Sequence, residues 1–326
     1  MKMDGMSRTG KGKYTGTIKK VHACAAVALL VALSLVSPAL AAQAGAGKKK
    51  QTPKGTPTLW REPGDIGARD LLRGPGADEM KPDLSSITFV EMVTGGYSTK
   101  YRVRDGAGRM WVVKVGKEAQ PETACTRLLW AVGYHADINY LVPKVEIKSK
   151  GTFENARFEA RPEGVERFGE WEWAQNPFVG TREFNGLKVL MVLFNNWDLK
   201  TSNNRIAHAR GEAGDELRYV VSDLGATFGK TGNFVTHNRN VPKDYAGTSF
   251  VEGVEGRKVI FGYHGKSKSV LDDITVDDAK WVGELLSRLS DQQIQDAFRA
   301  ANYGPEDVLL LSQVVRGRIN ELLKLQ

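Results

Sequence analysis

The sequence has few cysteines and histidines for its length. Its 326 residues include two cysteines, Cys24 and Cys125, and five histidines. Only one cysteine remains beyond the N-terminal segment, so a disulfide scaffold and a cysteine-based zinc site are both excluded for a monomer of that part. Cys125 stands among apolar residues of an expected helix, which indicates a core residue rather than a nucleophile. The histidines lack metal-ligand spacing, which argues against a zinc site or a catalytic histidine.

Internal repeats are absent, and a long apolar run occurs only near the N-terminus. The basic segment 1–20 precedes the apolar run Val21–Val36, and residues 37–41 read Ser-Pro-Ala-Leu-Ala. This order is typical of a secretory signal peptide, so we expect residues 1–41 to be removed and the protein to be exported to the periplasm or the cell exterior. The alternative is a membrane anchor, but the run is shorter than the ~20 apolar residues that span a bilayer. No transmembrane span is expected after cleavage.

A strong excess of one charge sign is also lacking once this segment is set aside. The formal net charge of the chain is +8, and the N-terminal segment supplies five of these charges, which leaves +3. We therefore expect no nucleic-acid partner. Residues 42–80 carry Lys48, Lys49, Lys50 and Lys54 in a Gly/Pro/Thr-rich setting. This composition predicts a basic linker that joins the signal peptide to a folded domain over 81–326.

The sequence contains a strand-rich first half and a helix-rich second half. Strands are expected over 87–93, 100–104, 110–115, 141–148 and 156–160. The sequence Asp-Gly-Ala-Gly at 105–108 predicts a hairpin turn between the second and third of these strands. A helix is expected from Pro121 to Val132, because proline favours the first turn of a helix and Gly133 follows the expected end.

The second half predicts a larger, mainly helical lobe. Residues 161–177 are polar and predict a connection, in which Trp171 and Trp173 are expected to pack in a core or hinge rather than to line a substrate groove. Apolar residues at helical spacing predict a buried helix over 181–194, and a strand is expected over 217–222. Amphipathic helices are expected over 277–301 and 305–325 as a C-terminal helical cap. Together the elements predict an α+β fold with a small antiparallel β lobe over about 81–165 and a larger lobe over about 166–326.

The candidate chemistry follows the expected buried helix directly. The sequence Asp-Leu-Lys-Thr-Ser-Asn occupies 198–203, and Asp-Leu-Gly at 223–225 ends the next strand. Phosphoryl transfer needs a carboxylate near the proton of the nucleophile, a cation on the moving phosphoryl group and oxygen ligands for magnesium. Each motif alone is also an ordinary capping or turn sequence. Their order and spacing favour one shared site.

In these two motifs the sequence resembles the protein-kinase-like superfamily. The segment Asp198-x-Lys200-x-x-Asn203 is similar to the catalytic loop of that superfamily, and Asp223-Leu-Gly is similar to its metal-binding triplet. The resemblance implies a two-lobed protein-kinase-like fold. It also implies that Asp198 is the catalytic base, that Lys200 contacts the transferred phosphate, and that Asn203 and Asp223 hold the metal.

The resemblance extends upstream in the expected order. Lys114 lies on the third expected strand, where kinase-like folds carry the lysine that anchors the nucleotide. Glu122, on the following helix, is then the implied ion-pair partner of this lysine, and Glu118 stays open as an alternative. Gly95 and Gly96 occupy the place of the phosphate-covering loop.

Asn196 and Trp197 stand where ordinary protein kinases carry His-Arg. The pattern is similar to atypical exported members, such as secretory-pathway and spore-coat kinase-like proteins. The resemblance implies an exported phosphotransferase that uses ATP with Mg²⁺, or Mn²⁺ in its place, and acts on a hydroxyl group of a protein, glycan or small molecule. Nucleotidyl transfer stays open. The alternative function is a catalytically impaired kinase-like module that binds a nucleotide or a partner in the cell envelope.

Overall fold

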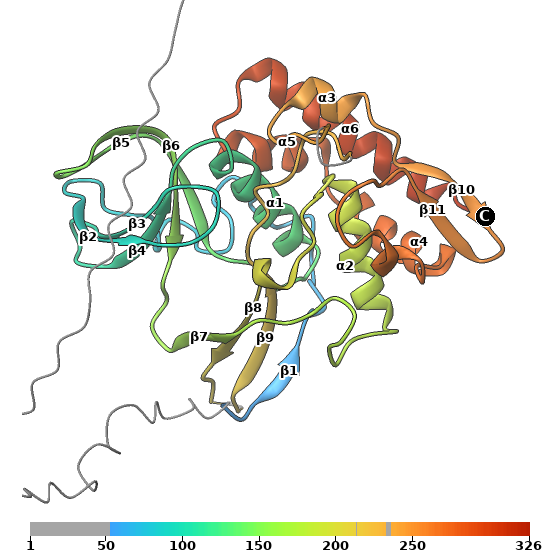
Figure 1. Ribbon diagram of the computed structural model, residues 1–326, viewed down its shortest axis with the longest axis horizontal. Helices are drawn as coiled ribbons and strands as arrows, with labels where there is room; N and C mark the ends of the chain where they lie inside the picture. Colours follow the sequence, from blue (N-terminus) through green and yellow to red (C-terminus); the bar gives the residue numbers. More distant parts are fainter. Residues whose placement is uncertain (1–52, 213, 233–235) are drawn as a thin grey trace, which may run out of the picture. The chain divides into compact units, whose positions relative to one another are not determined.

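The computed structural model describes residues 53–212, 214–232 and 236–326. The predicted signal peptide and the first part of the predicted linker lie outside the described residues. The described residues form a strand-rich lobe and a mainly helical lobe (Figure 1). No helix in these ranges is both long and apolar enough to cross a membrane.

The small lobe is a five-stranded antiparallel sheet with one helix. In spatial order its strands are β2 (Thr88–Val93), β3 (Lys100–Arg104), β4 (Met110–Lys114), β6 (Gly151–Ala160) and β5 (Asn139–Ile147). Successive side chains of a strand point to opposite faces of the sheet, so one face can pack inward while the other carries polar groups. Val103, Trp111 and Phe158 are buried in the core of this lobe, which is distinct from the core of the larger lobe.

The predicted hairpin turn between β3 and β4 is held by the buried side chain of Asp105. Its carboxylate accepts the backbone N–H of Arg109 at 2.8 Å and the indole N–H of Trp111 at 2.9 Å. Gly108 in the same turn has a φ of 83°, a conformation that glycine adopts without a steric penalty. The turn sets the register of the two strands, in which Lys100 lies directly opposite Lys114.

The helix of the small lobe, α1 (Ala119–Ala131), begins earlier than the predicted start at Pro121. Proline is tolerated throughout the first helical turn because the N–H groups there have no partner within the helix. Gly133 follows the helix with a φ of 96°, as a helix-ending glycine does. Helix α1 packs against β5 and β6 of its own lobe and against α5 (Asp291–Ala300) of the larger lobe. It therefore contacts both lobes.

The larger lobe contains five helices within the described ranges: α2 (Arg182–Leu193), α3 (Pro242–Ala246), α4 (Val276–Ser287), α5 and α6 (Pro305–Leu323). It also contains a four-stranded sheet in the order β1 (Thr56–Thr58), β9 (Glu216–Val221), β8 (Asn204–Ala209) and β7 (Val165–Gly169). A separate hairpin is made of β10 (Val251–Glu255) and β11 (Lys258–Phe261). The two-lobed α+β fold predicted from the sequence is thereby confirmed.

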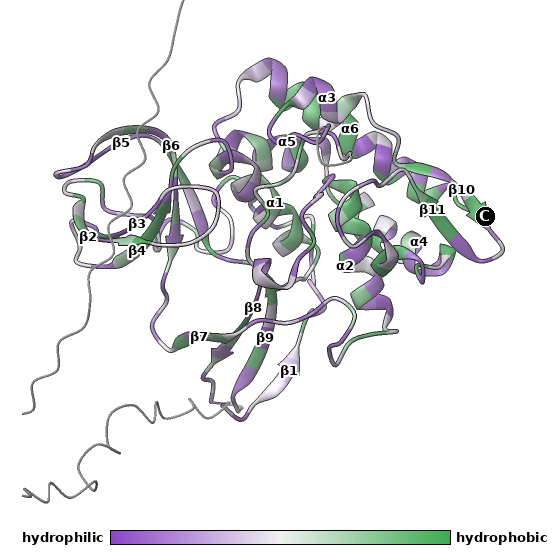
Figure 2. Ribbon diagram, in the orientation of Figure 1, coloured by the Kyte–Doolittle hydropathy of each residue, from purple (hydrophilic) through white to green (hydrophobic). Residues whose placement is uncertain are grey.

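Helix α2 is the buried helix that precedes the candidate catalytic loop. The hydroxyl of Thr181 caps it by accepting the backbone N–H of Phe184 at 3.2 Å. Phe184 and Leu190 are fully buried. The cap helix α6, in contrast, has alternating hydrophobic and hydrophilic bands along its length (Figure 2). The chain leaves α2 through Asn195, whose φ is 55°.

The predicted connection over 161–177 contains a strand, β7, which pairs antiparallel with β8. The sequence pattern does not predict either strand, since both are short and polar at several positions. Trp171 and Trp173 are buried in the core of the larger lobe, which confirms packing over a role in a substrate groove.

The folded domain also begins earlier than the predicted boundary at residue 80. Strand β1 pairs in parallel with β9. Leu59, Ile66 and Leu71 are buried in the core of the larger lobe. The Gly/Pro-rich composition obscured these three apolar positions, which are too far apart to form a periodic pattern. The segment from β1 onward is therefore part of the domain and not a free linker.

We predict that Ile66→Ala lowers the free energy of unfolding by about 2–5 kcal/mol, because it leaves a cavity in a packed core. Leu72→Ala is the matched control: Leu72 is 51% exposed, so its truncation should change stability by no more than about 0.5 kcal/mol. Urea denaturation of both variants measures the difference. Equal stability of the two variants would show that the segment does not belong to the core.

Candidate active site

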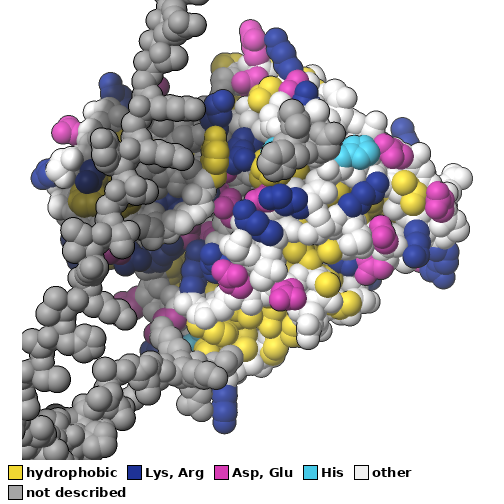
Figure 3. Space-filling view, in the orientation of Figure 1, with side chains coloured by type: hydrophobic (Ala, Val, Ile, Leu, Met, Phe, Trp, Pro, Cys, Tyr) yellow, Lys and Arg dark blue, Asp and Glu magenta, His cyan; other side chains and the backbone are white. Residues whose placement is uncertain are grey.

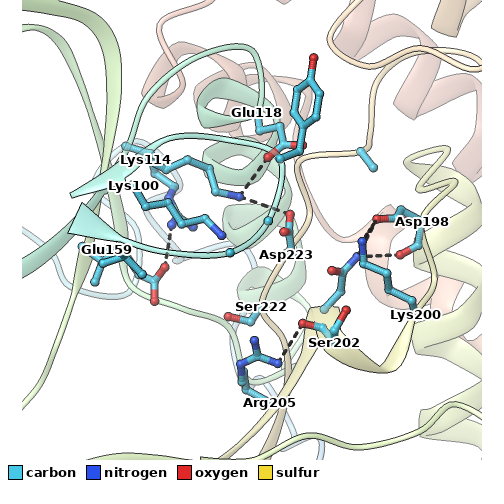
Figure 4. A pocket seen from close by; sticks show the side chains of 18 of the residues that line it. Lys100, Lys114, Glu118, Glu159, Asp198, Lys200, Ser202, Arg205, Ser222 and Asp223 are labelled. Atoms are coloured by element: carbon cyan, nitrogen blue, oxygen red, sulfur yellow. Dashed lines mark hydrogen bonds and ion pairs between the residues drawn. The ribbon is translucent and has the colours of Figure 1, made fainter. Parts of the chain in front are cut away.

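A cavity of about 680 Å³ lies between the lobes and contains the predicted site residues of both motifs. Side chains from the two lobes point into it (Figure 4). Ten of its lining side chains are basic and four are acidic. Lys and Arg side chains are also gathered on the face of the molecule between the lobes (Figure 3). A concave site with this excess of positive charge attracts an anionic ligand.

Lys114 lies at the inner end of this cavity, at the end of β4. Its ammonium group donates hydrogen bonds to Glu122 at 2.5 Å, to Glu118 at 3.3 Å and to Asp223 at 3.3 Å. The side chain is only 2% exposed. Burial alone would lower the pKa of Lys114, but Glu122, Asp223 and Glu118 together raise it above the ordinary value. The lysine is therefore held as a cation that joins the small lobe to the larger one.

Both candidate partners of this lysine contact it. Glu118 and Glu122 lie one turn apart at the start of α1, and both carboxylates face Lys114. Glu118 also accepts a hydrogen bond from the hydroxyl of Ser98 at 2.6 Å and pairs with Arg239. Burial raises the pKa of Glu122, and the charges of Arg157 and Lys114 oppose this shift by favouring the carboxylate. Both glutamates are therefore ion-pair partners of Lys114.

A series of ion-paired side chains of alternating charge begins at Glu122 and runs beside the cavity. Arg157 lies 2.9 Å from Glu122 and donates to Glu159 at 2.6 Å. Arg167 then lies 2.6 Å from Glu159 and pairs with Asp137. Burial opposes the ionised form of Glu159, but the charges of Arg167, Arg161 and Arg157 lower its pKa well below the usual range. These residues form the buried charge network of the site, which the sequence did not predict.

Asp198 follows α2 and is contacted by three side chains. Its carboxylate lies 2.7 Å from the ammonium group of Lys200 and 2.7 Å from that of Lys266. The amide of Asn203 donates to the backbone carbonyl of Asp198 at 2.7 Å and to its carboxylate at 3.2 Å. Burial would raise the pKa of Asp198, but the hydrogen bonds from Lys200, Lys266 and Asn203 outweigh it and lower the pKa. The group is thus held as a carboxylate.

The two predicted metal residues are connected through the backbone. The carbonyl of Asn203 accepts the N–H of Ser222 at 2.8 Å and the N–H of Asp223 at 3.1 Å. Asp223 also accepts the N–H of Gly225 at 3.3 Å. Burial would raise the pKa of Asp223, but the charge of Lys114 outweighs it and lowers the pKa well below the usual range. The structure therefore brings the catalytic-loop motif and the Asp-Leu-Gly motif together at one site.

The predicted phosphate-covering loop is the turn between β2 and β3. Gly95 and Gly96 line the cavity and have φ values of 97° and 83°. Tyr97, in the same turn, stacks over the guanidinium group of Arg239, which also stacks over Trp197. The turn therefore reaches the larger lobe across the mouth of the cavity.

Lys266 and Arg239 are site residues that sequence reasoning missed. Each is a single basic residue in a segment without a motif, and each reaches the cavity only through the tertiary fold. Lys266 comes from the loop after β11, and its backbone N–H is bonded to the carbonyl of Trp197 at 2.9 Å. No local sequence signal could have identified either residue.

The oxygen atoms of Asn203 and Asp223 fit the ligand preference of a small divalent cation. The side-chain amide N–H groups of Asn203 donate to Asp198, so the amide oxygen is the polar atom of this side chain that remains for a cation. Asp223 is 29% exposed and lines the cavity as a carboxylate. Magnesium is usually bound by one or two protein oxygens together with phosphates and water. Among the described residues there is no group of three or more His, Cys, Asp or Glu side chains suited to hold a metal ion.

The sequence matches no family model and no curated protein sequence. Solved structures similar to it include those of two kinases. The proinflammatory kinase CtkA of Helicobacter pylori is 12% identical, with a TM-score of 0.46 over 74% of this chain and 97% of that chain. The Rio2 kinase of Chaetomium thermophilum, solved as an ADP/Mg²⁺-phosphoaspartate complex, is 9% identical, with a TM-score of 0.31 over 73% of this chain and 72% of that chain. Both TM-scores lie below 0.5, and the class is defined by the geometry of the site.

That geometry is the arrangement of a protein-kinase-like fold. The lysine on the third strand of the small lobe pairs with glutamates of its single helix. The loop after a buried helix of the larger lobe supplies Asp198 and Asn203, and the end of the next hairpin supplies Asp223. Protein kinases place their lysine, glutamate and metal-binding residues on the corresponding elements. The chain accordingly has a two-lobed protein-kinase-like fold.

We predict that Arg157→Met destabilises the protein by about 3–5 kcal/mol, because it leaves the carboxylates of Glu122 and Glu159 buried with fewer partners. Arg102→Met is the control. Arg102 pairs with Glu91, and both side chains are about half exposed, so the loss should be about 1 kcal/mol or less. Free energies of unfolding from urea titration provide the comparison. A fully stable Arg157→Met protein would contradict the buried charge network.

Proposed function

We propose that this protein is an exported phosphotransferase that binds ATP with Mg²⁺ and transfers a phosphoryl group to a hydroxyl acceptor. The observation that carries the proposal is the contact of Lys114 with Asp223 at 3.3 Å, at one end of a cavity that also contains Asp198. It joins the nucleotide-anchoring and metal-binding positions of a kinase-like site. The signal-like N-terminus supports export, and Mn²⁺ could replace Mg²⁺ on the same oxygen ligands.

Four side chains would have separate roles in such a reaction. Asn203 and Asp223 would hold the metal, which would neutralise charge on the bound phosphates. Lys200, which is 47% exposed, would contact the transferred phosphoryl group. Asp198 would orient the acceptor hydroxyl and accept its proton. The basic lining adds electrostatic attraction for the polyphosphate.

The contacts of Asp198 bear on the alternative, a binding module with impaired catalysis. Both oxygens of the Asp198 carboxylate are paired with lysines, Lys200 on one and Lys266 on the other. An acceptor hydroxyl would compete with these lysines for the lone pairs of the Asp198 carboxylate. Lys266 is 58% exposed and Lys200 is 47% exposed. Because both lysine side chains are about half exposed, either ammonium group can turn toward solvent when the hydroxyl binds, and this favours the enzyme.

Removal of the metal-binding groups should affect binding and turnover together. We expect Asp223→Ala and Asn203→Ala to weaken Mg²⁺-dependent ATP binding, and the loss should be much smaller for ATP measured without metal. Calorimetric titration with and without Mg²⁺ measures the two ATP affinities. If Asp223→Ala leaves metal-dependent binding and turnover at the parental level, the metal assignment is wrong.

Removal of the proposed base should affect turnover alone. We expect Asp198→Ala to retain ATP affinity close to that of the parent protein and to lower the rate by about 10²-fold or more, the usual size of a general-base contribution. Titration of ATP and a phosphotransfer or ATP-hydrolysis assay on the same preparation separate the two effects. Loss of nucleotide binding in Asp198→Ala would contradict the assigned role. Binding by the parent protein without turnover on any acceptor would favour the binding module.

A further inference from the structure

A second lysine lies beside Lys114 in the cavity. The antiparallel register of β3 and β4 places Lys100 directly opposite Lys114. Residues that are directly opposite in such a pair project from the same face of the sheet, with Cβ atoms about 4.5–5.5 Å apart. Both lysines line the cavity, and Figure 4 shows both side chains extending toward Asp223. Two like charges in this position repel each other, so the fold carries an electrostatic cost here.

The two lysines differ in what they contact. An ammonium group has three N–H donors. Those of Lys114 are matched by the three carboxylates of Glu118, Glu122 and Asp223, all within hydrogen-bonding distance. This arrangement leaves Lys114 without a further donor for a phosphate oxygen. Its geometry suits a residue that positions other groups.

The ammonium group of Lys100 has no hydrogen bond or ion pair to another group within the described part of the chain. Its side chain is half-buried in the cavity. Burial lowers the pKa of Lys100, and the positive charge of Lys114 lowers it further, although Asp223 and Glu122 act in the opposite direction. A partly desolvated cation without a partner is unfavourable. An anion bound in the cavity would offset both the desolvation and the repulsion.

The turn between β2 and β3 lies against the end of this lysine. A side chain at Gly96 would place its Cβ 3.0 Å from the Lys100 ammonium nitrogen. The φ of Gly96 is 83°, which also favours glycine at this position. Because Gly96 has no side chain, the turn leaves room for the ammonium group of Lys100 next to its backbone. This is the place of the phosphate-covering loop.

From these contacts we propose that Lys100 is the lysine that donates to the phosphates of the bound nucleotide, and that Lys114 is a positioning residue for Glu118, Glu122 and Asp223. The proposal rests on the nucleotide-binding function proposed above and divides between two residues a role that the sequence assigned to Lys114 alone. Phosphate oxygens are strong acceptors, so the donors of Lys100 would gain charge-assisted hydrogen bonds. Sequence reasoning had no reason to select a lysine at the start of β3.

The test compares Lys100→Met, Lys100→Arg and Lys114→Met in the full-length protein, with Mg-ATP, Mg-ADP and adenosine as ligands in calorimetric titrations. We expect Lys100→Met to weaken Mg-ATP binding by about tenfold to a hundredfold, the range for a hydrogen bond to a charged group. The loss should be smaller for Mg-ADP and absent for adenosine. Lys100→Arg should restore part of the affinity. Lys114→Met should lower kcat by a larger factor than it lowers affinity for Mg-ATP.

Lys117→Met is the matched control, because Lys117 is exposed in the segment before α1 and does not line the cavity. It should bind all three ligands like the parent protein. The thermal unfolding midpoint of Lys100→Met should equal or exceed that of the parent, since the substitution removes a repulsion.

The outcomes separate this inference from the function on which it rests. Parental Mg-ATP affinity in Lys100→Met would overturn the role of Lys100 and leave the proposed function standing. An equal loss for adenosine and Mg-ATP would also overturn it, because that pattern indicates a general change of the cavity. A parent protein that binds none of these ligands would refute the proposed function, and the inference with it.

Discussion

Three carboxylates surround one buried ammonium group at the point where the two lobes meet. Lys114 comes from strand β4 of the small lobe, Glu118 and Glu122 from the N-cap and first turn of helix α1, and Asp223 from the larger lobe. A buried charge costs several kcal/mol unless it is paired with good geometry. The position of α1 and the closure of the cleft are therefore linked to this one ion-pair cluster. Any movement that separates the lobes must expose the ammonium group or leave Asp223 without its strongest partner.

The same cluster sets the electrostatic character of the cleft. From Glu122 the buried network runs through Arg157 and Glu159, with charges of alternating sign. The remaining basic side chains at the cavity surface are half-buried or exposed, and they exceed the acidic ones. The cavity surface therefore carries an excess of positive charge, which suits a site that receives a polyanion together with a metal ion.

Much of this arrangement could be predicted from the sequence. The strands of the small lobe, the buried helix and the two Asp-containing motifs are contiguous patterns, so local spacing was enough to identify Asp198 and Asp223. Arg157, Lys266 and Arg239 are isolated basic residues, and their place in the cleft depends on strand register and loop path. Strand β1 was missed for the opposite reason: its composition resembles a linker, although Leu59 and Ile66 nearby are buried. Local pattern identifies elements, but tertiary contacts decide which single residues meet.

The central claim is that the cavity binds a nucleotide through a metal. Calorimetric titration of the purified protein with ATP, in the presence of Mg²⁺, of Mn²⁺ and of a chelator, tests it most directly. The account predicts saturable binding with one nucleotide per chain that is strengthened by either metal and lost in large part with the chelator. Absence of binding under all three conditions, or binding of equal strength with and without metal, would contradict it.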